Sequence, residues 1–135
     1  MKIILLTLIL MLSGCFEKSG FITTTCTKEE VANSLSSKII YEIEFKKDII
    51  SNVIVTYEYN DTNIKTIDSI KKTIDSNDKF IEGLNKNVIT NDFNNYKISY
   101  TIDSSSSSLI KDKYNIKEKR SELVTLLKND GYTCK

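Results

Sequence analysis

The sequence predicts an α+β fold: a single small domain in which an antiparallel sheet of about four to five strands packs against two helices. Three segments carry apolar residues at every second position, the pattern of a half-buried strand: 39–45, 53–59 and 96–102. Two others, 61–84 and 117–130, carry apolar residues at helical spacing. Because the strand segments come in neighbouring pairs separated by polar turns, we expect hairpins and an antiparallel sheet.

The amino-terminal residues have the features of an export signal. Lys2 precedes an apolar run over residues 3–12, which matches the charged and apolar regions of a signal peptide. This run is too short to span a hydrocarbon core of about 30 Å, which requires about 20 residues. Ser13 and Gly14 are small enough for a peptidase site, and Cys15 follows at once.

The segment Leu12-Ser13-Gly14-Cys15 resembles the lipobox of bacterial lipoproteins. The resemblance implies cleavage between Gly14 and Cys15, diacylglycerol on the Cys15 thiol, and a cell-membrane anchor on the extracytoplasmic face. Two acyl chains anchor a protein stably, whereas one binds marginally. On this interpretation residues 1–14 are a helical lipoprotein signal peptide, 15–20 a lipidated tether and 21–135 the α+β domain. The alternatives are an uncleaved apolar anchor and a plain secreted protein.

Two cysteines remain if Cys15 carries the lipid. Cys26 and Cys134 form an even pair, and outside the membrane an even pair predicts a structural disulfide. This bond would join the start of the domain to the residue before the carboxyl terminus. In the chain-entropy view, closing so long a loop stabilises the fold by about 4–5 kcal/mol. The alternatives are two free thiols or a redox pair, although the chain has no C-x-x-C motif.

The first half of the domain is expected to contain an edge strand and a hairpin. Residues 21–27 are rich in threonine and favour the first, edge strand, whereas 28–37 are polar and show no clear preference. Strands over 39–45 and 52–59 are joined by the polar turn 46–48. Their alternation predicts one face on the core and one face in water.

Residues 61–88 contain a seven-residue repeat, DTNIKTI-DSIKKTI-DSNDKFI-EGLNKNV, with an acid first, a lysine fifth and an apolar residue last. An acid followed by a lysine four positions later stabilises a helix. We predict a helix that starts with Asp61 or Thr62 as its cap and ends near residue 84, where Gly83 weakens the last turn. Its apolar stripe packs on the chain's own sheet or forms a coiled coil through residues 61–88. The acids are interpreted as a solvated face, because each has a lysine neighbour.

The second half of the domain is expected to contain another hairpin. A short strand over 87–93 leads into a turn at residues 94–95. The strand over 96–103 alternates cleanly between apolar and polar residues. The serine run 104–108 offers no side chain for a core and predicts a loop.

The last predicted element is a helix from Lys117 to Asp130. It carries Leu123, Val124 and Leu127 on one side. Gly131 stands where a left-handed cap would end this helix.

In this order of elements, the chain resembles the YehR-like family of small bacterial lipoproteins. The resemblance spans the layout of residues 1–103: a lipobox, a hairpin such as IIYEIEFKKDIISNVIVTYEY, a polar helix and a strand such as YKISYTID, followed by a carboxyl-terminal helix. It implies a lipid-anchored α+β domain. The function of that family is uncharacterised, so no functional residue is transferred.

Composition excludes several functional classes. The chain after residue 14 carries 18 Lys+Arg and 18 Asp+Glu, so no basic surplus drives nucleic-acid binding. Histidine is absent, and no His/Cys cluster has the spacing of a zinc site. Ser-x-x-Lys occurs three times in this lysine-rich chain, which indicates chance: Ser69/Lys72, Ser76/Lys79 and Ser108/Lys111. We therefore predict no catalytic, metal-binding or cofactor-binding residue.

The function expected from these observations is a membrane-anchored, non-enzymatic binding or structural module of the cell envelope. We expect a monomer, with an envelope protein as a candidate partner. The alternatives are a small envelope enzyme, an inhibitor of one, and the coiled-coil oligomer. A binding module should expose an apolar or tyrosine-rich patch on the sheet face away from the helices. The strand tyrosines, which either pack the core or line a ligand groove, are Tyr41, Tyr57, Tyr59, Tyr96 and Tyr100.

Overall fold

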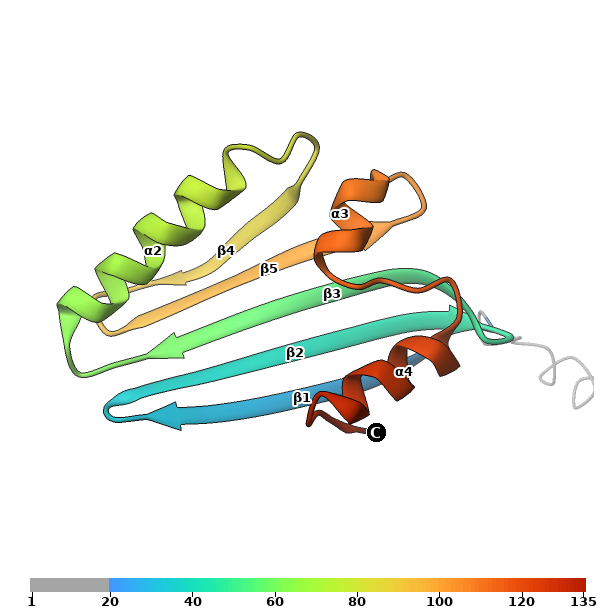
Figure 1. The fold of residues 1–135 in the computed structure, drawn as a ribbon, viewed down its shortest axis with the longest axis horizontal. Helices are drawn as coiled ribbons and strands as arrows, with labels where there is room; N and C mark the ends of the chain where they lie inside the picture. Colours follow the sequence, from blue (N-terminus) through green and yellow to red (C-terminus); the bar gives the residue numbers. More distant parts are fainter. Residues whose placement is uncertain (1–19) are drawn as a thin grey trace, which may run out of the picture.

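A computed structural model describes residues 20–135, which form one antiparallel sheet with helices on one face (Figure 1). The predicted signal peptide and the lipidation and cleavage residues, Gly14 and Cys15, lie outside the described residues. The sheet order is β4-β5-β3-β2-β1-β6. The elements are β1 (Ile22–Ala32), β2 (Leu35–Lys46), β3 (Ile49–Asn60), α2 (Ile64–Asp78), β4 (Asn85–Asn91), β5 (Asn95–Asp103), α3 (Ser108–Lys113), α4 (Arg120–Asn129) and β6 (Thr133–Cys134).

The α+β class and the antiparallel sheet are confirmed, but the predicted number of elements is too small. Within residues 20–135 the sheet has six strands and is joined by three helices. The additional strand is β6, which pairs with Cys26 and Thr27 of β1. Over that stretch β1 is therefore not the edge strand that was expected. The additional helix is α3, which begins inside the predicted serine loop.

The residues that showed no clear preference, 28–37, form the end of β1, a turn and the start of β2. Asn33 reverses the chain with a φ of 56°, a conformation that asparagine tolerates better than most residues. The strands there carry charge instead of an apolar stripe, for example Lys38 Nζ at 3.0 Å from Glu29 Oε1. Cross-strand pairing therefore forms this hairpin without the periodic signal that sequence reasoning requires.

The β2–β3 turn lies where the sequence predicts it. Lys47 and Asp48 both have positive φ values, 49° and 67°, which is the geometry of the tight hairpin turn that matches strand twist. Asp48 also caps α4, because its carboxylate accepts hydrogen bonds from the Ser121 backbone N–H at 2.9 Å and the Ser121 hydroxyl at 2.6 Å. These two bonds lower the pKa of Asp48. The loop and the helix therefore stabilise each other.

The helix α2 is shorter than predicted at both ends. Its cap is Asn63, not Asp61 or Thr62, and it ends at Asp78 instead of near residue 84. The buried Asp61 carboxylate accepts the Asn63 N–H at 2.8 Å and the Ser34 hydroxyl at 2.7 Å. These bonds lower the pKa of Asp61. The fourth unit of the repeat leaves the helix and enters β4.

The apolar stripe of α2 packs on the sheet of the same chain. Ile67 is fully buried, and Ile70 and Ile74 pack against the core. This is one of the two arrangements that the seven-residue repeat left open.

The helix α4 begins at Arg120, three residues later than predicted, and Gly131 follows it with a φ of 92°. Its own cap residue, Lys119, makes no side-chain capping bond, so Asp48 from the turn supplies the missing acceptor. Gly131 occupies the left-handed position that was predicted from the sequence.

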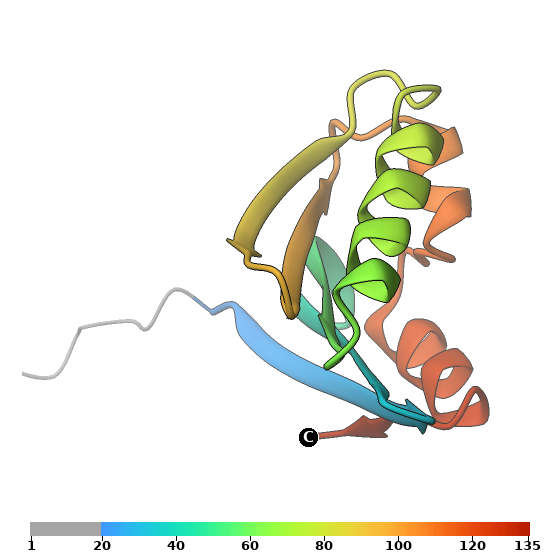
Figure 2. The ribbon, with the colours of Figure 1, turned by 90° about the vertical axis from the view of Figure 1, so that its left-hand side faces the viewer.

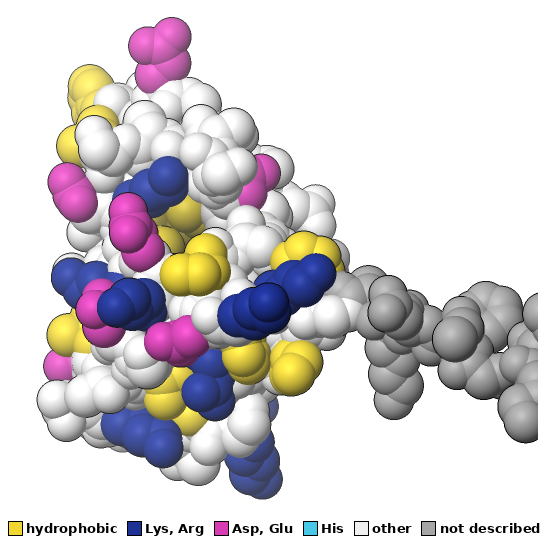
Figure 3. Space-filling view, turned by 90° about the vertical axis from the view of Figure 1, so that its right-hand side faces the viewer, with side chains coloured by type: hydrophobic (Ala, Val, Ile, Leu, Met, Phe, Trp, Pro, Cys, Tyr) yellow, Lys and Arg dark blue, Asp and Glu magenta, His cyan; other side chains and the backbone are white. Residues whose placement is uncertain are grey.

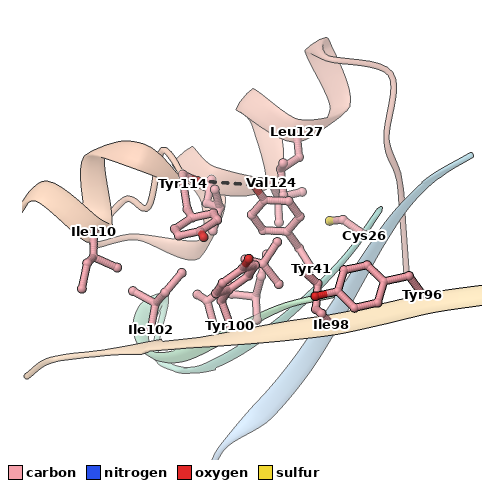
Figure 4. Packing of buried hydrophobic residues seen from close by; sticks show 14 of the residues in the cluster. Cys26, Tyr41, Tyr96, Ile98, Tyr100, Ile102, Ile110, Tyr114, Val124 and Leu127 are labelled. Carbon is pink, nitrogen blue, oxygen red and sulfur yellow. Dashed lines mark hydrogen bonds between the residues drawn. The ribbon is translucent and has the colours of Figure 1, made fainter. Parts of the chain in front are cut away.

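The core lies between the sheet and the helices, which form two layers (Figure 2). Figure 4 shows the buried side chains meeting between these layers. Strand residues at alternating positions meet helix residues there, and each fully buried aliphatic side chain contributes about 1.5–3 kcal/mol. The largest fully buried side chains are Ile43, Ile67, Ile98, Ile102, Ile110, Leu123, Val53, Val55 and Cys26.

Candidate functional site

The strand tyrosines lie on the helix-covered face of the sheet. Tyr41, Tyr96 and Tyr100 are buried, and Tyr57 and Tyr59 pack against the same core. The interpretation of these residues as core and cross-strand packing is therefore confirmed. The opposite face therefore carries none of these five tyrosines, so within residues 20–135 it lacks the tyrosine-rich patch that would distinguish a binding module.

The opposite face of the sheet is mostly polar. By alternation along β1 it carries Thr23, Thr25 and Thr27. Charged pairs cross it between strands, including Lys97 Nζ at 2.5 Å from Glu58 Oε1. Ile40 and Ile54 are half-buried apolar residues of the same face, and among polar neighbours they offer little apolar area to a partner.

Three of the strand tyrosines, Tyr57, Tyr59 and Tyr100, line a cavity of about 170 Å³ on the helix side. We call it the Asp78 cleft. It lies where the end of α2 and the end of α3 approach β3 and β5. Its lining residues are Tyr57, Tyr59, Ile74, Asn77, Asp78, Ile98, Tyr100, Lys113 and Tyr114.

Asp78 holds the polar side chains of this cleft together. Its side chain is only 12% exposed. It accepts a hydrogen bond from the Tyr100 hydroxyl at 2.7 Å and pairs with Lys86 Nζ at 3.0 Å and Lys113 Nζ at 3.4 Å. The carboxylate is therefore compensated by two cations and one hydroxyl, as a charge in so little water requires.

Lys86 remains charged in this cluster. Burial lowers the pKa of Lys86, but its hydrogen bonds to Asp75 and Asp78 raise the pKa more, so that the net shift is upward. Lys86 Nζ lies 2.8 Å from Asp75 Oδ1. This lysine belongs to β4, so the ion pairs connect β4 to the end of α2.

The tyrosine rings pack against one another beside Asp78. Tyr57 and Tyr59 are stacked, with centroids 6.5 Å apart and planes 7° apart. Tyr100 meets Tyr57 edge-on at 6.0 Å and Tyr114 at 5.3 Å. Burial, and then the hydrogen bond to Asp78, raise the pKa of Tyr100. The hydroxyl therefore stays protonated at neutral pH and donates to the carboxylate.

This arrangement is suited to binding. It combines a wall of aromatic rings with the amide of Asn77, the carboxylate of Asp78 and the ammonium group of Lys113. Clefts with apolar walls and a few convergent polar groups are the usual form of ligand sites. Within residues 20–135, no three His, Cys, Asp or Glu side chains lie close enough to hold a metal ion.

Of the residues that the sequence singled out, Cys26 and Cys134 are brought together. They form a disulfide between β1 and β6, which is the pairing that the cysteine count predicts. Sequence reasoning missed Asp78. An acid in the last turn of a helix opposes the helix dipole and needs nearby cations, but that signal requires the helix to end at Asp78, and the sequence placed its end later.

The fold and the cleft define a small α+β domain with one antiparallel sheet, helices on one face, and no helix among residues 20–135 that could cross a bilayer. No family model and no curated protein matches the sequence. The fold is similar to an NMR structure of a protein from Streptococcus pneumoniae TIGR4, with a TM-score of 0.55 and 11% sequence identity. The match covers 88% of this chain and 87% of the other. At this identity the likeness concerns the fold alone.

Proposed function

We propose that the protein is a bacterial lipoprotein, anchored in the cell membrane through diacylglycerol on Cys15 and exposed on the extracytoplasmic face. The carrying observation is the division of the three cysteines. Cys26 and Cys134 pair with each other, which leaves Cys15 behind the apolar run. A stable disulfide suits an oxidising compartment outside the cytosol. In this proposal residues 1–14 are removed, 15–20 form the tether and 21–135 the domain.

The domain is proposed to be a non-enzymatic binding module, in keeping with its resemblance to the YehR-like lipoproteins. Its ligand site is the Asp78 cleft. Tyr59 is half-buried there and can stack on a flat ring, while Asn77 and Lys113 offer hydrogen bonds at the edge. The proposed ligand or partner segment therefore combines an aromatic or sugar ring with polar groups.

The anchor is tested by fractionation and intact mass. The natural protein should appear in the membrane fraction, without residues 1–14 and with the added mass of a diacylglycerol. Cys15→Ser should release the protein from the membrane. Retention of this variant, or recovery of the natural protein with its starting methionine and no lipid, would contradict the proposal.

The binding role is tested by cross-linking in intact envelopes, followed by pull-down. Tyr59→Ala and Asn77→Ala should lose a partner that the natural protein retains, because both residues line the cleft. Phe93→Ala is the matched control, since Phe93 is an aromatic residue 76% exposed outside the cleft. Equal capture by all variants would move the binding surface away from the Asp78 cleft.

A further inference from the structure

Three segments meet at the end of the sheet where the described chain begins. We call this surface the tether end and define it as residues 20–22, 45–50 and 116–120. Ile22 pairs with Phe45 across β1 and β2. The Ile50 N–H donates to the Glu118 carbonyl at 2.9 Å. Hydrogen bonds therefore join the start of β1, the β2–β3 turn and the α3–α4 connection into one continuous surface, which faces the viewer in Figure 3.

The tether end exposes apolar side chains at the start of β1, at the start of β3 and just before β1. Phe21, Ile22 and Ile49 are 47%, 62% and 55% exposed. Ile49 also lines a cavity of about 320 Å³, together with Ile50 and Ile116. In Figure 3, hydrophobic side chains on this surface lie among Lys and Arg side chains, with Asp and Glu side chains interspersed.

The tether end also carries a net positive charge, unlike the described residues as a whole. Residues 20–135 as a whole carry no net charge, because the chain's 19 Lys+Arg and 18 Asp+Glu include Lys2, Lys18 and Glu17 outside this range. The tether end has a net charge of +3, from five cations and two acids: Lys46, Lys47, Lys117, Lys119, Arg120, Asp48 and Glu118. Apolar residues surrounded by cations are the pattern of a surface that meets anionic lipid headgroups.

The length of the tether brings this surface to the membrane. The argument depends on the proposed function, in which Cys15 carries the lipid. Five residue steps separate Cys15 from Gly20, and an extended chain spans at most about 18 Å over that number. The surface potential of an anionic bilayer decays over about 8–10 Å. A tether of this length allows the tether end to come within the range of that potential, whereas the β1–β2 turn and the start of α2 lie at the opposite end of the sheet (Figure 1).

We propose that the tether end docks on the bilayer surface through anionic phospholipids. Lys46, Lys47, Lys117 and Lys119, all exposed, contact the phosphates. Phe21, Ile22 and Ile49 enter the headgroup layer between them. This contact fixes the orientation of the domain relative to the membrane, which the lipid on Cys15 alone would not do.

The test is lysine footprinting of the lipid-bearing protein with a membrane-impermeant acetylating reagent, read by mass spectrometry. The protein is compared in neutral detergent, in phosphatidylcholine vesicles, and in vesicles containing phosphatidylglycerol. In the anionic vesicles the tether-end lysines should react at about one third of their rate in detergent or below it. High salt should restore their reactivity. Lys65 and Lys72, exposed residues of α2, serve as internal controls and should not change.

Two charge-reversed variants sharpen the test. Lys46→Glu with Lys47→Glu should remove the protection of Lys117 and Lys119 in anionic vesicles. Lys65→Glu with Lys72→Glu makes the same charge change on α2 and should preserve that protection.

The outcomes separate this inference from the proposed function. Lipid on Cys15 with equal labelling in detergent and anionic vesicles overturns the docking and leaves the anchor intact. Equal protection of the tether-end and α2 lysines also overturns it. So does protection in detergent that grows with protein concentration, because a second copy would then cover the surface. Absence of lipid on Cys15 overturns both proposals.

Discussion

The two edges of the sheet are held in different ways. At the disulfide edge, formed by β1, β6 and α4, the helix buries Leu123, Val124 and Leu127, and a covalent bond ties the chain end to β1. At the α2 edge, formed by α2 and β4, the helix is longer, with 15 residues against 10, but buries only one side chain completely. The strand β4 buries none.

This difference indicates that helix length does not decide how firmly an edge is held. The α2 edge depends on Ile67, on the partly buried Ile70 and Ile74, and on the ion pair of Asp78 with Lys86, whose side chains are 12% and 18% exposed. The disulfide edge depends on apolar packing and a covalent bond. Segments with few buried contacts open first in the native state, so we expect the α2 edge, which also forms one side of the Asp78 cleft, to be the more mobile one.

The largest expected effect is loss of the disulfide. The double variant Cys26→Ala, Cys134→Ala frees a loop whose ends are 108 residues apart, which should lower the free energy of unfolding by about 4–5 kcal/mol in the chain-entropy model. Urea unfolding measures this. The natural protein under reducing conditions is the control and should lose a similar amount. A loss below about 1 kcal/mol would mean that packing alone holds the disulfide edge.

The next largest effect is expected from removing a buried side chain at each edge. Ile67→Ala and Leu123→Ala each remove a fully buried side chain and should each cost about 2–5 kcal/mol. Hydrogen exchange distinguishes them. Ile67→Ala should accelerate exchange in α2 and β4 while β1–β3 stay protected, whereas Leu123→Ala should accelerate it in α4 and β6. Uniform acceleration in both variants would show that the two edges open as one unit.

The sequence predicted the apolar strands better than the polar segments that complete the fold. The alternation of apolar and polar residues identified the central strands, because the apolar residues in it, such as Tyr96, Ile98 and Ile102 of β5, are the buried ones. The polar half of the β1–β2 hairpin shows no alternation of apolar and polar residues. Its strands could therefore not be predicted without knowing that β1 pairs with β2. The serine run also misled, because Ser107 caps α3 by accepting the Ile110 N–H at 3.4 Å. Capping depends on one residue and not on the composition of the run.

The Asp78 cleft could not be predicted for a different reason. Its lining residues come from α2, β3, β5 and the end of α3, while Lys86, the partner of Asp78, comes from β4; only tertiary packing brings them together. In the repeat, Lys86 occupies the position of a helical partner for Glu82, but the chain has turned into β4 by then. Lys86 therefore meets Asp75 and Asp78 across a loop instead of along a helix.

A smaller effect is expected from Asp78→Asn. The amide keeps the shape but loses the charge that compensates Lys86 and Lys113. Hydrogen bonds to a charged group contribute about 1.5–3 kcal/mol, so the free energy of unfolding should fall by about 2 kcal/mol. The control is Asp75→Asn, whose carboxylate shares Lys86 but is 61% exposed. Equal losses in the two variants would mean that burial of Asp78 adds nothing to the α2 edge.

The smallest effect is expected where the sequence is most regular. Asp68 and Lys72 form an i,i+4 pair at 2.7 Å, but their side chains are 58% and 77% exposed. Water and salt screen such pairs, and many contribute nothing measurable. Lys72→Ala should therefore leave the urea midpoint unchanged at low and high salt, although Ile67 one residue before Asp68 is indispensable to the same helix. A clear fall in the urea midpoint at low salt that disappears at high salt would instead show that the i,i+4 ion pairs of α2 help to stabilise the α2 edge. The two edges would then differ less in how they are held.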